Sequence, residues 1–147
     1  MKSVAEILKT KPDQHVYRVA PDVSVYDALQ LMADKNLGAV LVMEDNRIVG
    51  ILSERDYARK LALMDRSSKA TRVSEVMTAP VMYVRPDQTN EECMALMTDH
   101  RMRHLPVIDD GRLVGLLSIG DLVKDIISEQ QFIIDQLQHY ITGHPRG

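Results

Sequence analysis

Two stretches of the chain repeat the same order of apolar and polar residues. The first runs from Val16 to Ala62 and the second from Val81 to Ile127, and their register holds without a gap. In each stretch a short apolar run precedes a segment with helical spacing. Two apolar runs joined by a polar turn follow, and then a second segment with helical spacing. Each stretch therefore predicts a β-α-β-β-α unit, and a duplication this regular outweighs any single motif.

The first half of each unit predicts a short strand and a capped helix. The strands are predicted over 16–19 and 81–84. Ser24 and Thr89 are predicted N-caps, because Asp27 and Glu92 stand three residues after them, as in a capping box. The helices are predicted to end near Asn36–Leu37 and Arg101–Met102.

The second half of each unit predicts a β-hairpin and a closing helix. The unbroken apolar run Val40–Met43 predicts a buried strand, and Arg47–Leu52 returns after an Asp-Asn turn. The second copy runs over 105–117, with an Asp-Gly turn. Both hairpins end in the motif Gly-h-h-Ser-x-x-Asp (h, apolar), at Gly50–Asp56 and Gly115–Asp121. Ser53 and Ser118 are predicted to open the closing helices.

Three further segments complete the predicted organisation. Short amphipathic turns over 4–8 and 73–77 precede the units, and a polar linker covers 64–72. In the tail, one apolar stripe at helical spacing predicts an amphipathic helix that Gly143 and Pro145 stop. The stripe consists of Phe132, Ile133, Leu137, Tyr140 and Ile141. The predicted divisions are 1–72, 73–127 and 128–147.

The predicted class is α+β. One unit cannot cover both faces of its sheet, so the two tandem units are expected to pack together with pseudo-two-fold symmetry, with the tail helix added.

Composition restricts the classes of function. The chain has 147 residues and is 45% hydrophobic and 27% charged, as in ordinary globular proteins. Its net charge of −3 argues against general nucleic-acid binding, which needs a basic face. The single cysteine, Cys93, indicates a reducing compartment. No apolar run approaches the ~20 residues of a membrane span, and the first ten residues lack a secretory signal. We expect a cytoplasmic protein with no membrane partner.

The paired units resemble a known family. Two β-α-β-β-α units, each closing on Gly-h-h-Ser-x-x-Asp, resemble a pair of cystathionine-β-synthase (CBS) domains, often called a Bateman module. The resemblance covers all but residues 128–147, and segments 53–60, 67–71 and 100–107 resemble small stand-alone members. It implies binding of adenosine-containing ligands such as AMP, ADP, ATP, NAD or S-adenosylmethionine. It also implies a response by conformational change, dimers of pairs, and sensing rather than catalysis.

The duplicated motif suits such a ligand. A carboxylate can accept both hydroxyl protons of a ribose diol, the role expected for Asp56 and Asp121. Ser53 and Ser118, at helix starts, can face phosphate. Ser-x-x-Asp is equally a plain helix cap, and the two roles are compatible.

The resemblance assigns further site residues by position. Arg103 and His104 are expected to serve phosphates of the ligand whose ribose Asp56 holds; a solvated charge and a half-buried histidine are the alternatives. Arg55 is expected to reach phosphates at the Asp121 site, or else to form a surface ion pair. The remaining residues are expected to line adenine, with plain core packing as the alternative. They are Val16, Tyr17, Val81 and Met82.

The expected function is a regulatory, adenosyl-nucleotide-binding sensor of energy or redox state, acting by ligand-induced conformational change. AMP is the expected ligand, with NAD or ATP open, and a homodimer is expected. We expect no catalytic residue, metal site or catalytic cofactor, because the sequence has no glycine-rich phosphate loop and no convincing histidine spacing for a metal. The alternatives are a structural or protein-interaction module without nucleotide, and an enzyme of small nucleotides.

Overall fold

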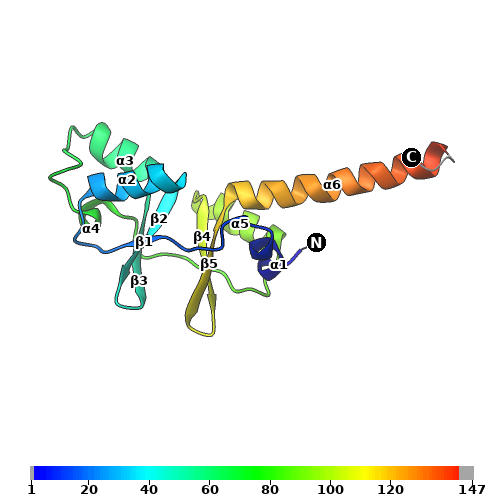
Figure 1. Ribbon diagram of the computed structural model, residues 1–147, viewed down its shortest axis with the longest axis horizontal. Coiled ribbons are helices and arrows are strands. Elements are labelled where there is room, and N and C mark those ends of the chain that lie inside the picture. Colours follow the sequence, from blue (N-terminus) through cyan, green and yellow to red (C-terminus); the bar gives the residue numbers. More distant parts are fainter. Residues whose placement is uncertain (1, 143–147) are drawn as a thin grey trace. The chain divides into compact units, whose positions relative to one another are not determined.

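The chain forms two compact units. The computed structural model describes residues 2–142, with side chains up to His139. The first unit consists of residues 15–82, and the second combines residues 2–14 with the segment from Tyr83 onward. Each unit joins a small sheet to helices, which confirms the predicted α+β class (Figure 1).

The first unit is built on a three-stranded sheet. Its strands are β1 (Arg18–Val19), β2 (Ala39–Glu44) and β3 (Arg47–Ser53), in the order β1-β2-β3. β1 runs parallel to β2, and β2 and β3 form an antiparallel hairpin. Its helical segments are α2 (Val25–Lys35), α3 (Glu54–Tyr57), the π-helical turn η1 (Ala58–Ala62) and α4 (Val73–Val76). Side chains from α2, β2, β3, η1 and α4 make one apolar core.

The second unit repeats this plan around a hairpin. Its strands are β4 (His104–Asp109) and β5 (Arg112–Ser118), and its helices are α1 (Val4–Lys9), α5 (Asn90–His100) and α6 (Ile119–Thr142). Val84 bridges Val107 in parallel, as Val19 of β1 pairs with Val42 of β2. The two units therefore use the same strand pairing at matching positions of the repeat.

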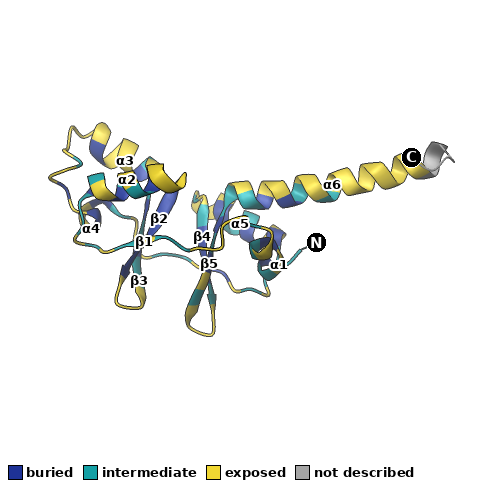
Figure 2. Cartoon of the chain, viewed as in Figure 1, coloured by how far each residue is buried: buried dark blue, intermediate teal, exposed yellow. Residues whose placement is uncertain are grey.

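The predicted caps and turns are confirmed. The Ser24 side chain accepts from the Asp27 N–H at 3.1 Å, and the Thr89 side chain accepts from the Glu92 N–H at 3.3 Å. Asn36 and Arg101 end these helices in the left-handed conformation. β2 is buried along almost its whole length, as its unbroken apolar run predicts (Figure 2). Both hairpins carry a register shift at the same point, after Val42 and after Val107.

Two predicted elements differ from the structure. The strands predicted over 16–19 and 81–84 are too long, because only Arg18, Val19 and Val84 take part in strand pairing. An apolar run reports burial rather than ladder formation: Tyr17 packs on the core of the first unit without pairing its backbone in a strand.

The tail is not a separate helix. α6 runs without a break from Ile119 to Thr142, since no glycine or proline separates the closing helix of the second repeat from the tail. The predicted stop at Gly143 and Pro145 lies outside the described residues, as do the side chains of Tyr140 and Ile141.

The short helices before the repeats explain the glycine of the duplicated motif. α1 packs against β5 and α6, and α4 packs against β3. A Cβ atom on Gly115 would lie 2.7 Å from both Leu8 Cδ atoms, and one on Gly50 would collide with the Met77 side chain. Each glycine therefore admits a side chain from the segment that covers its hairpin. The predicted division at residue 72 follows the sequence repeats and stays a prediction.

Replacing Gly115 with alanine is expected to destabilise the protein by about 1–3 kcal/mol, because the added methyl overpacks the contact with Leu8. Urea unfolding of the full chain measures the change. Gly120→Ala is the matched control, since a Cβ there meets only Ser118 Oγ at 3.5 Å. Equal midpoints for Gly115→Ala and the parent would contradict this account of the glycine.

Candidate functional site

The first candidate site lies where β3 gives way to α3. The Ser53 side chain accepts from the Asp56 N–H at 3.2 Å. In return, the Ser53 N–H and Oγ–H donate to Asp56 Oδ2 at 3.0 and 3.1 Å. These bonds satisfy backbone donors that a helix start leaves without partners, and they fix the orientation of the carboxylate.

The other oxygen of Asp56 is also engaged. Oδ1 accepts from Thr78 Oγ1 at 3.0 Å and lies 3.1 Å from Lys60 Nζ. A two-way backbone hydrogen bond with Ile51 holds Thr78 beside the hairpin. Asp56 is 8% exposed. Both of its oxygens therefore have protein partners, and a ligand hydroxyl there has to replace or share one of them.

The second candidate site lies where β5 gives way to α6. The Ser118 N–H donates to Asp121 Oδ2 at 2.8 Å, and the Asp121 N–H donates to Ser118 Oγ at 3.2 Å. The cation here is Lys11, whose Nζ lies 3.0 Å from Asp121 Oδ2 and donates to the Leu116 carbonyl at 2.7 Å. Among the described contacts, Oδ1 of Asp121 accepts no hydrogen bond. The Asp121 side chain is 16% exposed, so this carboxylate keeps acceptor capacity.

One substitution between the repeats explains the different cations. The residue four positions after the motif aspartate is Lys60 in the first repeat and Asp125 in the second. Asp125 is buried, accepts from Asn90 Nδ2 at 2.8 Å and lies 3.5 Å from Lys2 Nζ. Two carboxylates four residues apart on one helix repel each other, and the lysines at positions 2 and 11 offset this repulsion. The N-terminal segment thus neutralises the start of α6.

Arg103 and His104 border the second site. β4 begins at His104, opposite Ser118 in the strand pairing, and the Arg103 carbonyl accepts from the Ile119 N–H at 2.8 Å. Burial lowers the pKa of His104 to about 4, although the Asp121 carboxylate acts in the opposite direction. The imidazole is therefore neutral at pH 7 and can donate one hydrogen bond. Gly38 and Ala39 occupy the matching positions in the first repeat.

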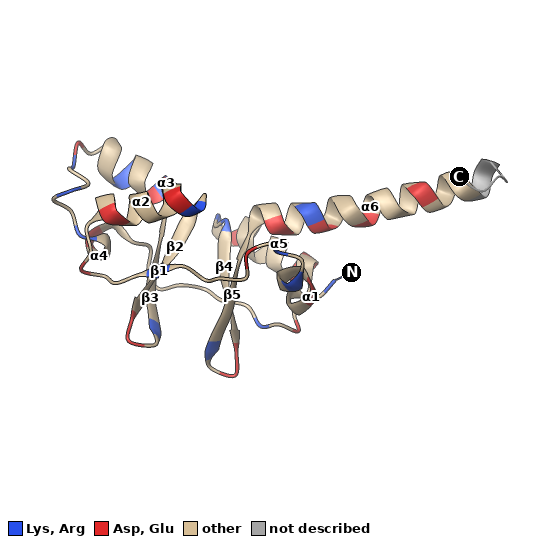
Figure 3. Ribbon diagram, in the orientation of Figure 1, with Lys and Arg blue, Asp and Glu red and all other residues tan. Residues whose placement is uncertain are grey.

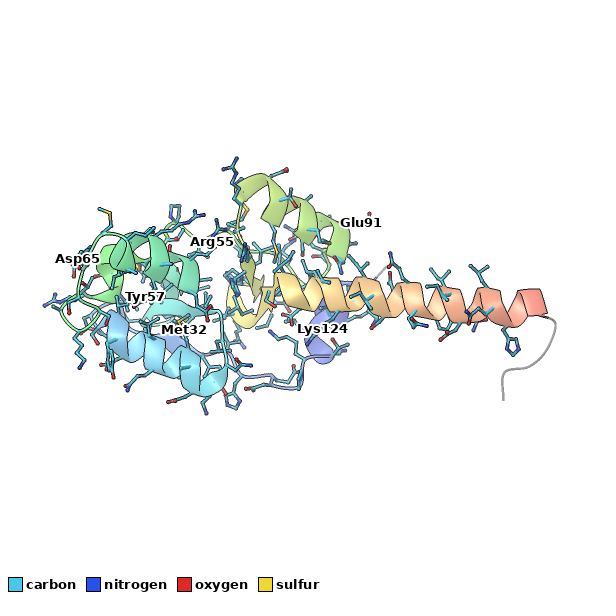
Figure 4. The ribbon with its side chains drawn as sticks, turned by 90° about the horizontal axis from the view of Figure 1, so that it is seen from above. Met32, Arg55, Tyr57, Asp65, Glu91 and Lys124 are labelled. Atoms are coloured by element: carbon cyan, nitrogen blue, oxygen red, sulfur yellow. The ribbon has the colours of Figure 1, made fainter. Side chains whose placement is uncertain are left out.

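The predicted site residues fall into two groups. In the second unit the structure brings four of them together, namely Arg103, His104, Ser118 and Asp121. The first unit holds the others, and Arg55 projects from α3 next to Asp56 (Figure 4). Tyr17 stacks on His15 with ring centroids 5.8 Å apart, and Lys35 Nζ lies 5.6 Å from the Tyr17 ring centroid. Val16, Val81 and Met82 are half-buried.

Three residues that contact the motif aspartates were not among the predicted site residues. Lys60 could have been found, because it stands four residues after Asp56 on the same helix face. Lys11 and Thr78 lie in irregular segments after α1 and α4, where the two repeats lose their common spacing. Periodicity gives no signal for them.

The chemistry offered is that of hydrogen bonding. A fixed carboxylate, a serine hydroxyl, a helix start and nearby cations can bind a polyol and an anion together. Among residues 2–142, no group of three or more His, Cys, Asp or Glu side chains is placed to hold a metal ion. None of the described helices is both long and apolar enough to span a membrane.

Comparison with known proteins identifies the family. The family model described as "CBS domain" matches residues 4–63 and again residues 73–128. The chain belongs to the CBS-domain family. The two matches make it a CBS pair.

Several relatives resemble this CBS pair along most of its length. The mitochondrial CBS domain-containing protein CBSX3 of Arabidopsis thaliana is 37% identical over 96% of this chain and 72% of its own. A solved structure of a protein with CBS domains from Burkholderia ambifaria is 60% identical. It covers 88% of this chain and 96% of its own, with a TM-score of 0.85. The solved structure of CBSX2 in complex with AMP is 31% identical. It covers 88% of this chain and 99% of its own, with a TM-score of 0.70.

The pH dependence of stability tests the burial of His104. Its folded pKa of about 4 lies below the ordinary value of 6.5, so the unfolded chain binds more protons between these values. Stability is fully present above about pH 6.5 and falls as the pH drops toward 4. This group accounts for a loss of about 2 kcal/mol between pH 7 and pH 5 and of about 3 kcal/mol by pH 4. Urea unfolding at pH 5 and pH 7 measures the loss.

His104→Gln is expected to reduce this pH dependence. His100→Gln, at the exposed end of α5, controls for the loss of an imidazole. A pH dependence equal to that of the parent in His104→Gln would contradict the burial of a neutral imidazole.

Proposed function

We propose that this CBS pair is a regulatory module that binds an adenine nucleotide, with AMP as the first ligand, and does not catalyse a reaction. The observation that carries the proposal is the same serine–aspartate pair at both strand–helix junctions. The AMP complex of CBSX2, a relative aligned over most of this chain, supports the choice of ligand.

The ribose is the part of the ligand that the carboxylates recognise. Two vicinal hydroxyls can donate to one carboxylate, and each charge-assisted hydrogen bond contributes about 1.5–3 kcal/mol. Asp121 is the better prepared of the two, since its Oδ1 has capacity left and its side chain reaches solvent. At Asp56 the ribose replaces Thr78 or Lys60, which raises the cost of binding there.

The phosphate of the ligand is proposed to bind hydrogen-bond donors at a helix start and positively charged side chains. Ser118 opens a long helix, whose N-terminal field favours an anion, and Arg103 supplies a planar fork suited to phosphate. Ser53, Arg55 and His104 as phosphate contacts remain predictions. So does the lining of adenine by four residues, namely Val16, Tyr17, Val81 and Met82. Recognition of NAD or ATP in place of AMP also stays open.

Ligand binding is proposed to act through Lys11. Lys11 joins Asp121 of α6 to the segment that leads from α1 into the first unit. One ribose hydroxyl can donate to Oδ1, and the second, donating to Oδ2, competes there with Lys11. This competition weakens the ion pair and loosens residues 10–14. One state of the protein has the Lys11–Asp121 ion pair and the other lacks it. The ligand can shift the equilibrium between these states only by the difference in its affinity for them.

Asp121→Asn is expected to weaken AMP binding about tenfold or more, the loss of about 1.4 kcal/mol or more of charge-assisted contact. Isothermal titration calorimetry of the full chain measures affinity and stoichiometry. Asp56→Asn tests the first site, and Asp99→Asn, on the exposed surface of α5, is the control. Unchanged AMP affinity and stoichiometry in both motif variants would defeat the assignment, provided that their melting temperatures show them folded.

AMP is expected to speed amide hydrogen exchange in residues 10–14 several-fold, because it releases Lys11. In Lys11→Gln the same amides are expected to exchange fast without AMP and to respond little when it is added. Exchange in residues 10–14 that AMP slows equally in the parent and in Lys11→Gln would contradict this coupling.

A second candidate is a protein-interaction module with no bound nucleotide. It is favoured by the exposed apolar side chains along α6. A thermal-shift panel of AMP, ATP, NAD and S-adenosylmethionine separates the two candidates. A rise in melting temperature at millimolar AMP supports the nucleotide module, and no rise with any of the four favours the alternative. The cytoplasmic location and the homodimer stay predictions.

A further inference from the structure

α6 extends beyond the part of the second unit that it covers. Leu122 and Asp125 are buried, whereas every side chain from Gln130 to His139 is exposed (Figure 2). Asp125 still contacts Asn90 of α5, whereas the outer part of α6 extends away from the other elements of the second unit (Figure 4). The outer half of this helix therefore leaves its apolar side chains exposed to solvent.

Four exposed apolar residues of α6, with Gln130 between them, follow a heptad spacing. Alternate steps of four and three residues join the members of what we name the α6 seam. It consists of Val123, Ile127, Gln130, Ile134 and Leu137. Ile127, Ile134 and Leu137 are 58%, 47% and 54% exposed, and Ile133 flanks them. α6 has 24 residues, a little over three heptads, so the seam runs along most of the helix.

We infer that the α6 seam pairs with the α6 seam of a second copy of this chain, as a parallel two-stranded coiled coil. Positions beside the seam decide whether like helices repel. Here they are Lys124, Ile126, Gln131, Ile133 and Gln138, of which only Lys124, at the inner end of the seam, carries a charge. Two copies therefore approach without the repulsion that charged flanking residues produce.

The charges of α6 also argue against other occupants. Between residues 125 and 139 the helix carries Asp125, Glu129 and Asp135 and no lysine or arginine (Figure 3). A helix that lies on an anionic lipid surface carries basic residues on its polar face, and an acidic partner needs them too. A second copy of the same neutral seam requires neither.

Gln130 fixes the direction of the pair. A polar residue within an apolar seam needs a hydrogen-bond partner once the seam is buried. In a parallel, in-register pair the two Gln130 amides face each other and can donate and accept between themselves. In an antiparallel coiled coil an a position of one helix faces a d position of the other, so each Gln130 faces Ile127 or Ile134. The parallel arrangement is the one that satisfies both amides.

Sedimentation velocity of the full chain over a range of concentrations tests the seam. The double variant Ile134→Glu/Leu137→Glu is expected to weaken self-association at least tenfold. Phe132→Glu is the matched control, because Phe132 is 65% exposed on the side of α6 away from the seam. Self-association of the double variant equal to that of the parent would overturn the proposal. So would a parent that stays monomeric but co-sediments with phosphatidylglycerol vesicles.

Cross-linking tests the direction independently of folding stability. Gln130→Cys is expected to form an intermolecular disulfide under mild oxidation, whereas Ser128→Cys, on the polar side of α6, forms little. The native Cys93 is buried and does not compete. Equal cross-linking at positions 128 and 130 would overturn the parallel seam. Neither experiment involves a nucleotide, so its outcome is separate from that of the proposed function.

Discussion

A serine and an aspartate exchange hydrogen bonds at the point where each hairpin turns into a helix. This exchange caps the helix, ends the strand and holds a carboxylate in one orientation. The glycine three residues before each serine admits a covering side chain, Met77 in one unit and Leu8 in the other. The motif thus joins the hairpin, the following helix and the covering segment, and the rest of each unit is arranged around this junction.

Capping and ligand binding are compatible because a carboxylate has more acceptor positions than a cap uses. Asp121 uses one oxygen for the cap and for Lys11 and keeps the other. Asp56 uses both of its carboxylate oxygens, because Lys60 and Thr78 contact Oδ1 while the cap uses Oδ2. The two repeats therefore share a motif but differ in readiness for a ligand. The difference follows from Thr78 and from the residue four positions after the motif aspartate, which is lysine in one repeat and aspartate in the other.

The sequence predicted those parts of the fold that local interactions determine. Ser24 and Thr89 cap helices, and the Asp-Asn and Asp-Gly pairs turn hairpins, because the residues involved are neighbours in sequence. The strand lengths near Val16 and Val81 were wrong, since backbone pairing depends on a distant strand edge. The continuity of α6 was missed because an apolar stripe shows a face of a helix and not where it begins.

In the candidate site, too, the residues placed by local interactions could be predicted and those placed by tertiary contacts could not. Ser118 and Asp121 could be read from their spacing, while Lys11 reaches Asp121 across more than a hundred residues of sequence. The packing of α1 on the second unit, which places Lys11, has no local signal. The lowered pKa of His104 depends on tertiary burial and on the neighbours this burial brings, which spacing alone does not reveal.

The central claim is that the motif aspartates meet the ribose of an adenine nucleotide. The Ser118 amide, which donates to Asp121 at 2.8 Å, reports on that carboxylate directly. An AMP titration followed by amide NMR is predicted to shift the Ser118 resonance in a saturable way, with Ser53 following at higher concentration. Saturable shifts elsewhere in the chain with both serine amides unmoved would contradict the account.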